Sequence, residues 1–157
     1  MPVDHRTAES GYTFVELAIA TAVLAAVVAI AVPMYRGYAE RAAMQRAIAE
    51  LRVLQAAIDR NIAEFSRVPD TITHLPESKQ LDPWGRPYQY LNVSGSAPKT
   101  NSGKRRKDRN LVPINSDYDL YSSGPDGASQ PALTAAASQD DVVRANDGAY
   151  LGPASEY

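Results

Sequence analysis

The sequence contains no cysteine, so neither a disulfide bond nor a cysteine-based metal site can form. It contains only two histidines, which makes a histidine-based metal site a poor explanation as well. The formal net charge of −2 indicates neither a nucleic-acid-binding domain nor an acidic tail. No nucleophile-elbow context supports a catalytic triad, so we predict that the chain is not an enzyme.

Charged residues are also scarce in residues 12–33, which are otherwise almost entirely apolar. A helix needs about 20 such residues to cross the hydrocarbon core of a membrane. The one charge is Glu16, near the start of the stretch. A carboxylate inside a membrane segment costs about 2.5–3.5 kcal/mol, so we expect Glu16 to have a partner or a function.

Two simpler interpretations of this stretch are a secretory signal peptide and a plain membrane anchor. The run is too long for a signal peptide, and no small-residue cleavage site is followed by a polar mature sequence. A plain anchor would place Glu16 at the membrane surface, but it would not need the particular order of residues 11–17.

A short polar leader ends in Gly11, and Tyr12, the Thr-Phe-Val-Glu-Leu sequence of residues 13–17 and the apolar run follow it. This order resembles the prepilin motif of type IV pilins and type II secretion pseudopilins. In that family a membrane peptidase cuts after the glycine and methylates the new amino terminus. The resemblance implies removal of residues 1–11, cleavage between Gly11 and Tyr12, and N-methylation of Tyr12.

The same resemblance gives Glu16 a role in assembly. Cleavage would place an α-amine with a pKa near about 8 on Tyr12, and this amine would be mostly cationic at neutral pH. A carboxylate is its natural counter-ion in a low dielectric, and a pair within one helix is possible. The family implies instead that Glu16 reaches the amine of the next subunit and so registers the helices in a filament.

The basic residues give a conflicting signal about orientation. The leader has only Arg6, whereas Arg36, Arg41 and Arg46 follow the apolar run, and the positive-inside rule alone favours the reverse topology. The motif requires Gly11 to face a cytoplasmic-side peptidase. We therefore predict a single-pass inner-membrane protein with a periplasmic C-terminal domain.

Helix-forming residues resume directly after Pro33, so we expect this proline to bend the helix rather than end it. Apolar residues then recur every three or four positions, which predicts one buried stripe. The stripe consists of Ile48, Leu51, Leu54, Ile58, Ile62 and Phe65. We predict one helix over residues 12–66 and a globular domain over residues 67–157.

Two further motifs lie in the globular domain. Residues 82–91 combine turn chemistry with a strand that begins near Tyr88, and Trp84 is expected to pack this turn on the helix rather than form an aromatic ligand cradle. Residues 117–127 alternate as a strand and then turn at a Gly-Pro-Asp-Gly sequence. Both segments are similar to the major pseudopilins, and they predict an α+β fold with a small antiparallel sheet of about three strands and a loop-rich C-terminus.

The resemblance also implies a calcium site, because in the family an acidic pair follows this turn and completes one. Its ligands here would be the backbone carbonyl of Ser123 and the carboxylates of Asp126, Asp140 and Asp141, which are hard oxygen donors of the kind calcium prefers. An insert over residues 128–139 separates the turn from the acidic pair.

Residues 99–109 carry a cluster of basic side chains, and such a cluster can bind nucleic acid. No aromatic residues interleave with it, so we favour a solvated loop and predict no nucleic-acid partner. The cluster consists of Lys99, Lys104, Arg105, Arg106, Lys107 and Arg109.

The resemblance therefore implies a structural subunit of a type II secretion pseudopilus. Its expected partners are further copies of the chain, minor pseudopilins, the prepilin peptidase, the inner-membrane assembly platform and a secretin. A subunit of a type IV pilus for adhesion, motility or DNA uptake is the alternative. A membrane-tethered module that binds a ligand through its basic loop is a third interpretation.

Overall fold

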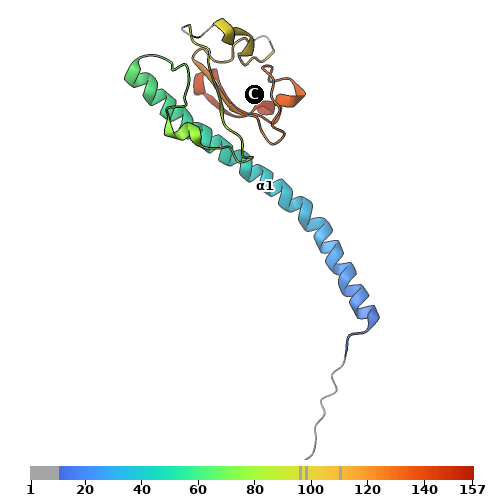
Figure 1. Ribbon diagram of the computed structural model, residues 1–157. Coiled ribbons are helices and arrows are strands. Elements are labelled where there is room, and N and C mark those ends of the chain that lie inside the picture. Colours follow the sequence, from blue (N-terminus) through green and yellow to red (C-terminus); the bar gives the residue numbers. More distant parts are fainter. Residues whose placement is uncertain (1–10, 96, 98, 110) are drawn as a thin grey trace, which may run out of the picture. The chain divides into compact units, whose positions relative to one another are not determined.

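The structure is a computed structural model that describes residues 11–95, 97, 99–109 and 111–157 (Figure 1). The predicted leader therefore lies outside the described residues except for Gly11. The chain divides into two compact units, Met1–Glu40 and Arg41–Tyr157.

The helix α1 spans Phe14–Phe65 and continues through Pro33, as the sequence predicts. It is the one helix among the described residues that is long and apolar enough to cross a membrane. Ser66 follows it with a φ of 53°, a left-handed conformation that ends helices. Pro69 lies just beyond and cannot continue the helix.

The α+β fold is confirmed, but the antiparallel sheet has four strands rather than about three. The strands β1 (Gln89–Asn92), β2 (Tyr118–Ser122), β3 (Val142–Ala145) and β4 (Tyr150–Pro153) are neighbours in chain order. The C-terminus, predicted to be rich in loops, supplies β3 and β4. The β4 sequence contains glycine and proline, which are depleted in strands. The proline, which has no N–H to donate to a neighbouring strand, is tolerated because β4 lies at the edge of the sheet.

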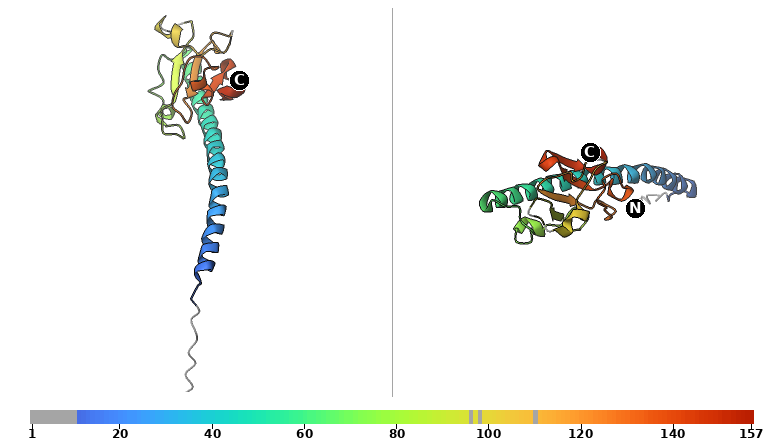
Figure 2. Two further views of the ribbon diagram at one scale, coloured as in Figure 1. Left: turned by 90° about the vertical axis from the view of Figure 1, so that its right-hand side faces the viewer. Right: turned by 90° about the horizontal axis from the view of Figure 1, so that it is seen from above.

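One face of the sheet packs on the part of α1 that belongs to the second unit (Figures 1 and 2). Leu51, Leu54 and Ile58 of the predicted stripe are buried, and Ile48 and Ile62 pack at its margin. Phe65 was predicted to be buried and is 58% exposed, because the end of α1 extends beyond the surface on which the helix packs. Trp84 packs on the same cluster, as expected.

Tyr118 of β2 and Tyr88, which directly precedes β1, also hydrogen-bond to carboxylates of α1. The Tyr118 hydroxyl donates to Asp59 Oδ1 at 2.8 Å, and the Tyr88 hydroxyl donates to Glu50 Oε2 at 2.7 Å. Burial raises the pKa of both phenols, and the bond to the carboxylate adds to the rise, so each phenol stays protonated and can donate. These bonds fix the register of the helix on the sheet.

We predict that Tyr118→Phe lowers the free energy of unfolding by about 1.5 kcal/mol, because it removes a hydrogen bond to a charged acceptor while keeping the buried ring. Thermal unfolding of the full-length protein in detergent, followed by Trp84 fluorescence, measures this. Tyr35→Phe is the control, because Tyr35 is 74% exposed, and it should change stability by less than about 0.5 kcal/mol. Equal effects of the two substitutions would contradict the prediction.

The other face of the sheet is covered by the two long connections between strands. Ile114, from the β1–β2 connection, and Leu133, from the β2–β3 connection, pack with Val143, Ala145 and Ala154 in a second buried cluster. The β1–β2 connection contains the basic residues. The expectation of a fully solvated basic loop is therefore wrong at Arg106, which is 2% exposed.

Candidate functional site

The N-terminus of α1 is closed by a reciprocal cap. Glu16 Oε2 accepts hydrogen bonds of 2.8 Å from both the backbone N–H and the hydroxyl of Thr13. The Glu16 N–H donates back to Thr13 Oγ1 at 3.2 Å, and the Thr13 carbonyl accepts from the Leu17 N–H at 3.1 Å. This is a capping box, in which the residue before the helix and the third helical residue satisfy each other's backbone. Sequence reasoning gave Glu16 a partner in another subunit and missed its local partner, although the Thr-x-x-Glu spacing signals it.

The predicted cleavage point directly precedes this cap. Gly11 and Tyr12 lie outside the helix, and Tyr12 is 92% exposed. Apart from its chain neighbours, no atom of the described residues lies within 4 Å of a Cβ placed at Gly11. The backbone between the two residues is therefore open to an enzyme.

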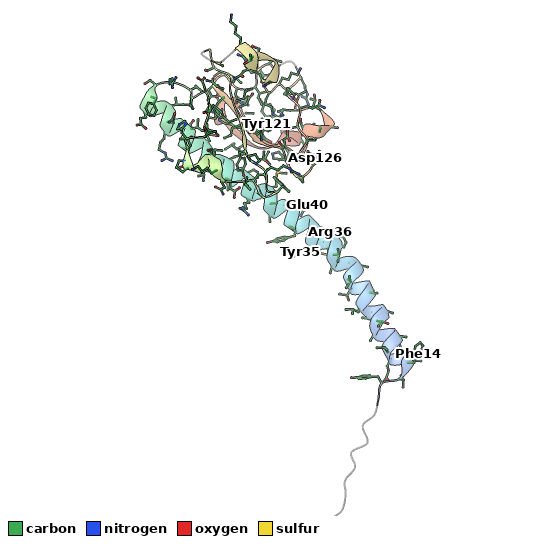
Figure 3. All side chains as sticks on the ribbon, in the orientation of Figure 1. Phe14, Tyr35, Arg36, Glu40, Tyr121 and Asp126 are labelled. Carbon is green, nitrogen blue, oxygen red and sulfur yellow. The ribbon has the colours of Figure 1, made fainter. Side chains whose placement is uncertain are left out.

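The apolar side chains of α1 that follow the cap are exposed in the isolated chain. Figure 3 shows the Phe14 and Tyr35 side chains standing out from the helix, and Phe14 is 85% exposed. The hydroxyl of Thr21, the other polar side chain of the run, donates to the carbonyls of Leu17 and Ala18. A surface with its polar groups satisfied internally is suited to lipid or to packing against other helices.

The capped carboxylate can still receive a cation. A carboxylate offers about four acceptor sites on its two oxygens, and the Thr13 bonds occupy only Oε2. Glu16 is exposed, so a second group can approach it. The structure thus places Gly11, Tyr12 and Glu16 together at one end of an exposed apolar helix.

The predicted calcium ligands lie in the β2–β3 connection, and three of them, near the turn, each accept a hydrogen bond from a backbone N–H. The Gly127 N–H donates to the Ser123 carbonyl at 3.1 Å, and the Ala128 N–H donates to Asp126 Oδ1 at 2.7 Å. The Asp126 N–H donates to Asp140 Oδ2 at 3.2 Å, so the insert does not carry Asp140 away from the turn.

The fourth predicted ligand, Asp141, is turned into the protein. It is fully buried, and its Oδ2 accepts from the Ser129 hydroxyl at 2.6 Å and from the Arg106 guanidinium. Its Oδ1 is buried without a hydrogen-bond partner among the described residues. The described part of the chain contains no group of three or more histidine, aspartate or glutamate side chains that could hold a metal. The four residues therefore do not fit one calcium coordination sphere in this arrangement, and the calcium site stays a prediction.

Comparison with known proteins finds similarity to type II secretion proteins and to fimbrial proteins. The chain is 27% identical over 143 residues to the type II secretion system core protein G of Pseudomonas aeruginosa, a match that covers 78% of this chain and 87% of that protein. The corresponding protein of Aeromonas hydrophila is 28% identical over 105 residues, which cover 54% of this chain and 73% of that protein. A fimbrial protein of Pseudomonas aeruginosa is 33% identical over 75 residues.

The chain is a distant homologue of the pseudopilins and fimbrial pilins. The match to the fimbrial protein covers 48% of this chain and only 47% of that protein, so the chain spans about half the length of the fimbrial relatives that it matches. No family model matches the sequence. No solved structure matches it either. The pilin-like fold agrees with the homology, because a long N-terminal helix packs on an antiparallel sheet.

Proposed function

We propose that this pilin-like chain is a structural subunit of a type II secretion pseudopilus, a periplasmic filament for protein export. Support comes from the similarity to core protein G, which extends over 78% of the chain, whereas the similarity to the fimbrial proteins extends over 48%. The observation that carries the proposal is the capped helix α1, whose apolar N-terminal surface is exposed in the isolated chain. Such a surface needs a membrane before assembly and other helices after it.

In this proposal, residues 1–11 are removed and Tyr12 becomes the methylated N-terminus. The cationic amine of one subunit then pairs with Glu16 of its neighbour, while Thr13 continues to hold the other side of that carboxylate. The pairing sets the axial step between subunits, because the amine and the carboxylate must meet in a low dielectric.

The proposed location is the inner membrane, crossed once by residues 12–33, with the second unit in the periplasm. The proposed partners are further copies of the chain, minor pseudopilins, the prepilin peptidase, the assembly platform and a secretin. Arg106 is buried and so is withdrawn from any surface that could bind a nucleic acid or another external ligand. The other basic residues of the segment are not buried, so this burial removes one cation from the interpretation of the chain as a membrane-tethered binding module and leaves the rest.

A type IV pilus subunit is the second candidate, and the fimbrial matches favour it. Deleting the gene in its native host separates the two functions. We expect secreted proteins to accumulate in the periplasm while surface pili and twitching persist, and a plasmid copy of the gene should restore secretion. Loss of surface pili with normal secretion would overturn the proposal in favour of the pilus.

A further inference from the structure

The two connections that cover the outer face of the sheet are bound to each other. The Lys107 N–H donates to the Pro131 carbonyl at 2.9 Å, and the Leu133 N–H donates to the Lys107 carbonyl at 2.9 Å. These bonds make a short parallel bridge between Lys107 and Ala132. The basic segment and the insert over residues 128–139 are therefore held against each other, although they are distant in the sequence.

Arg106, in the basic segment, contacts both the sheet and the insert. Its backbone N–H donates to Asp119 Oδ2 on β2 at 2.8 Å, and its guanidinium lies 3.9 Å from the centroid of the Tyr121 ring. The same guanidinium donates to Ser129 Oγ at 2.8 Å, to the Gln130 carbonyl and to Asp141 Oδ2. One buried cation therefore joins β2, the insert and the residue that precedes β3.

The charge balance at Asp141 depends on that cation. The Asp141 carboxylate is fully buried, and a buried carboxylate without a cation or several donors is strongly disfavoured. The bond from Ser129 is neutral, so Arg106 supplies the positive charge in contact with Asp141. Among the described residues, Oδ1 of Asp141 and Nε of Arg106 are buried without a hydrogen-bond partner, so the pair is not fully satisfied by protein groups.

A second guanidinium holds the neighbouring turn. Arg86 donates to the Gly124 carbonyl at 2.5 Å and to the Pro125 carbonyl at 3.2 Å. Gly127 leaves the room for it, since a Cβ there would lie 2.5 Å from the Arg86 guanidinium carbon. Calcium binds through carboxylates and carbonyls of this kind. Here arginine binds one of the four predicted ligands, Asp141, and the two carbonyls that follow Ser123, while Ser123, Asp126 and Asp140 accept from backbone N–H groups.

We propose that Arg106, assisted by Arg86, is the built-in cation that ties the β2–β3 connection to the sheet, in the place that the family resemblance gives to calcium. A guanidinium suits this position because its planar fork can bond several oxygens at once and its charge is permanent. The fold of the connection is then independent of calcium. This inference does not rest on the proposed filament role, because its readout is the stability of the isolated chain.

The first experiment uses the full-length wild-type protein in detergent, stripped with a chelator. We expect the melting temperature, followed by Trp84 fluorescence, to be the same in excess chelator and in millimolar calcium chloride. We also expect no saturable heat when calcium is titrated into the protein. This measurement needs no variant, so it decides the question even if a substituted chain fails to fold.

The second experiment is a double-mutant cycle on the ion pair. Arg106→Gln and Asp141→Asn should each lower the melting temperature by about 10 °C, because each leaves a buried charge unpaired. The double variant should lose little more than either single variant. Lys107→Gln is the matched control, a neighbouring basic side chain that is exposed, and it should leave the melting temperature nearly unchanged.

Two results would overturn the proposal. One is a melting temperature of the wild-type protein that rises with calcium, returns with the chelator and no longer responds in Asp126→Asn, since the metal would then hold the loop. The other is additive losses in the cycle, since Arg106 and Asp141 would then act separately.

Discussion

Replacing Glu16 with alanine is expected to abolish filament assembly while the subunit still enters the membrane. Removing a carboxylate from the membrane segment favours insertion by about 2.5–3.5 kcal/mol. Within a filament, however, the amine of the neighbouring Tyr12 would be buried without its counter-ion. Breaking a buried pair in this way costs about 3–5 kcal/mol at each contact, a loss repeated along the whole filament.

The capping box requires a second variant, because alanine at position 16 removes both the charge and the bonds to Thr13. Glu16→Gln keeps an acceptor for Thr13 and so keeps the cap, but it removes the charge. Sheared filaments and membrane fractions should be quantified for both variants. If charge pairing drives assembly, both variants fail, and Glu40→Ala, a control in the same helix, assembles normally. Normal filaments from Glu16→Gln would show that Glu16 acts only as a helix cap.

Replacing Gly11 with valine is expected to block maturation almost completely. The described part of the chain has room for the substitution, because none of its atoms other than those of the chain neighbours lies within 4 Å of a Cβ at Gly11. A failure to mature would therefore report exclusion from the peptidase rather than a folding defect. Gly37→Ala is the matched control, since Gly37 is equally open but lies within α1, and this variant should be processed normally.

Intact mass spectrometry of protein taken from native membranes measures this outcome. The wild-type chain should lack residues 1–11 and carry one methyl group on Tyr12, whereas Gly11→Val should retain its full length. Recovery of residues 1–11 from assembled wild-type filaments would contradict both the cleavage point and the proposed maturation.

The sequence alone determined the features that depend on neighbouring residues. Composition on both sides of Pro33 predicted a helix that continues through it, and the structure confirms this. The strand at residues 118–122 was predicted by the alternation of its side chains. The packing of Trp84 was likewise predicted from the turn that holds it. For the helix and the strand the physical cause lies within a few residues along the chain. The surface on which Trp84 packs is instead made by residues that are distant from it in the sequence.

Only the tertiary structure decided the outer face of the sheet and the fourth strand. Arg106 and Asp141 are separated by 35 positions, and nothing in either local sequence distinguishes a buried arginine from its exposed neighbours. Their pairing follows from the bridge between the two connections, which exists only once the sheet has formed. The strand β4 likewise forms because β3 offers it an open edge, which compensates for the weak strand preference of its glycine and proline. Local patterns fixed the long helix and its motif, whereas contacts between distant segments determined which charges are buried.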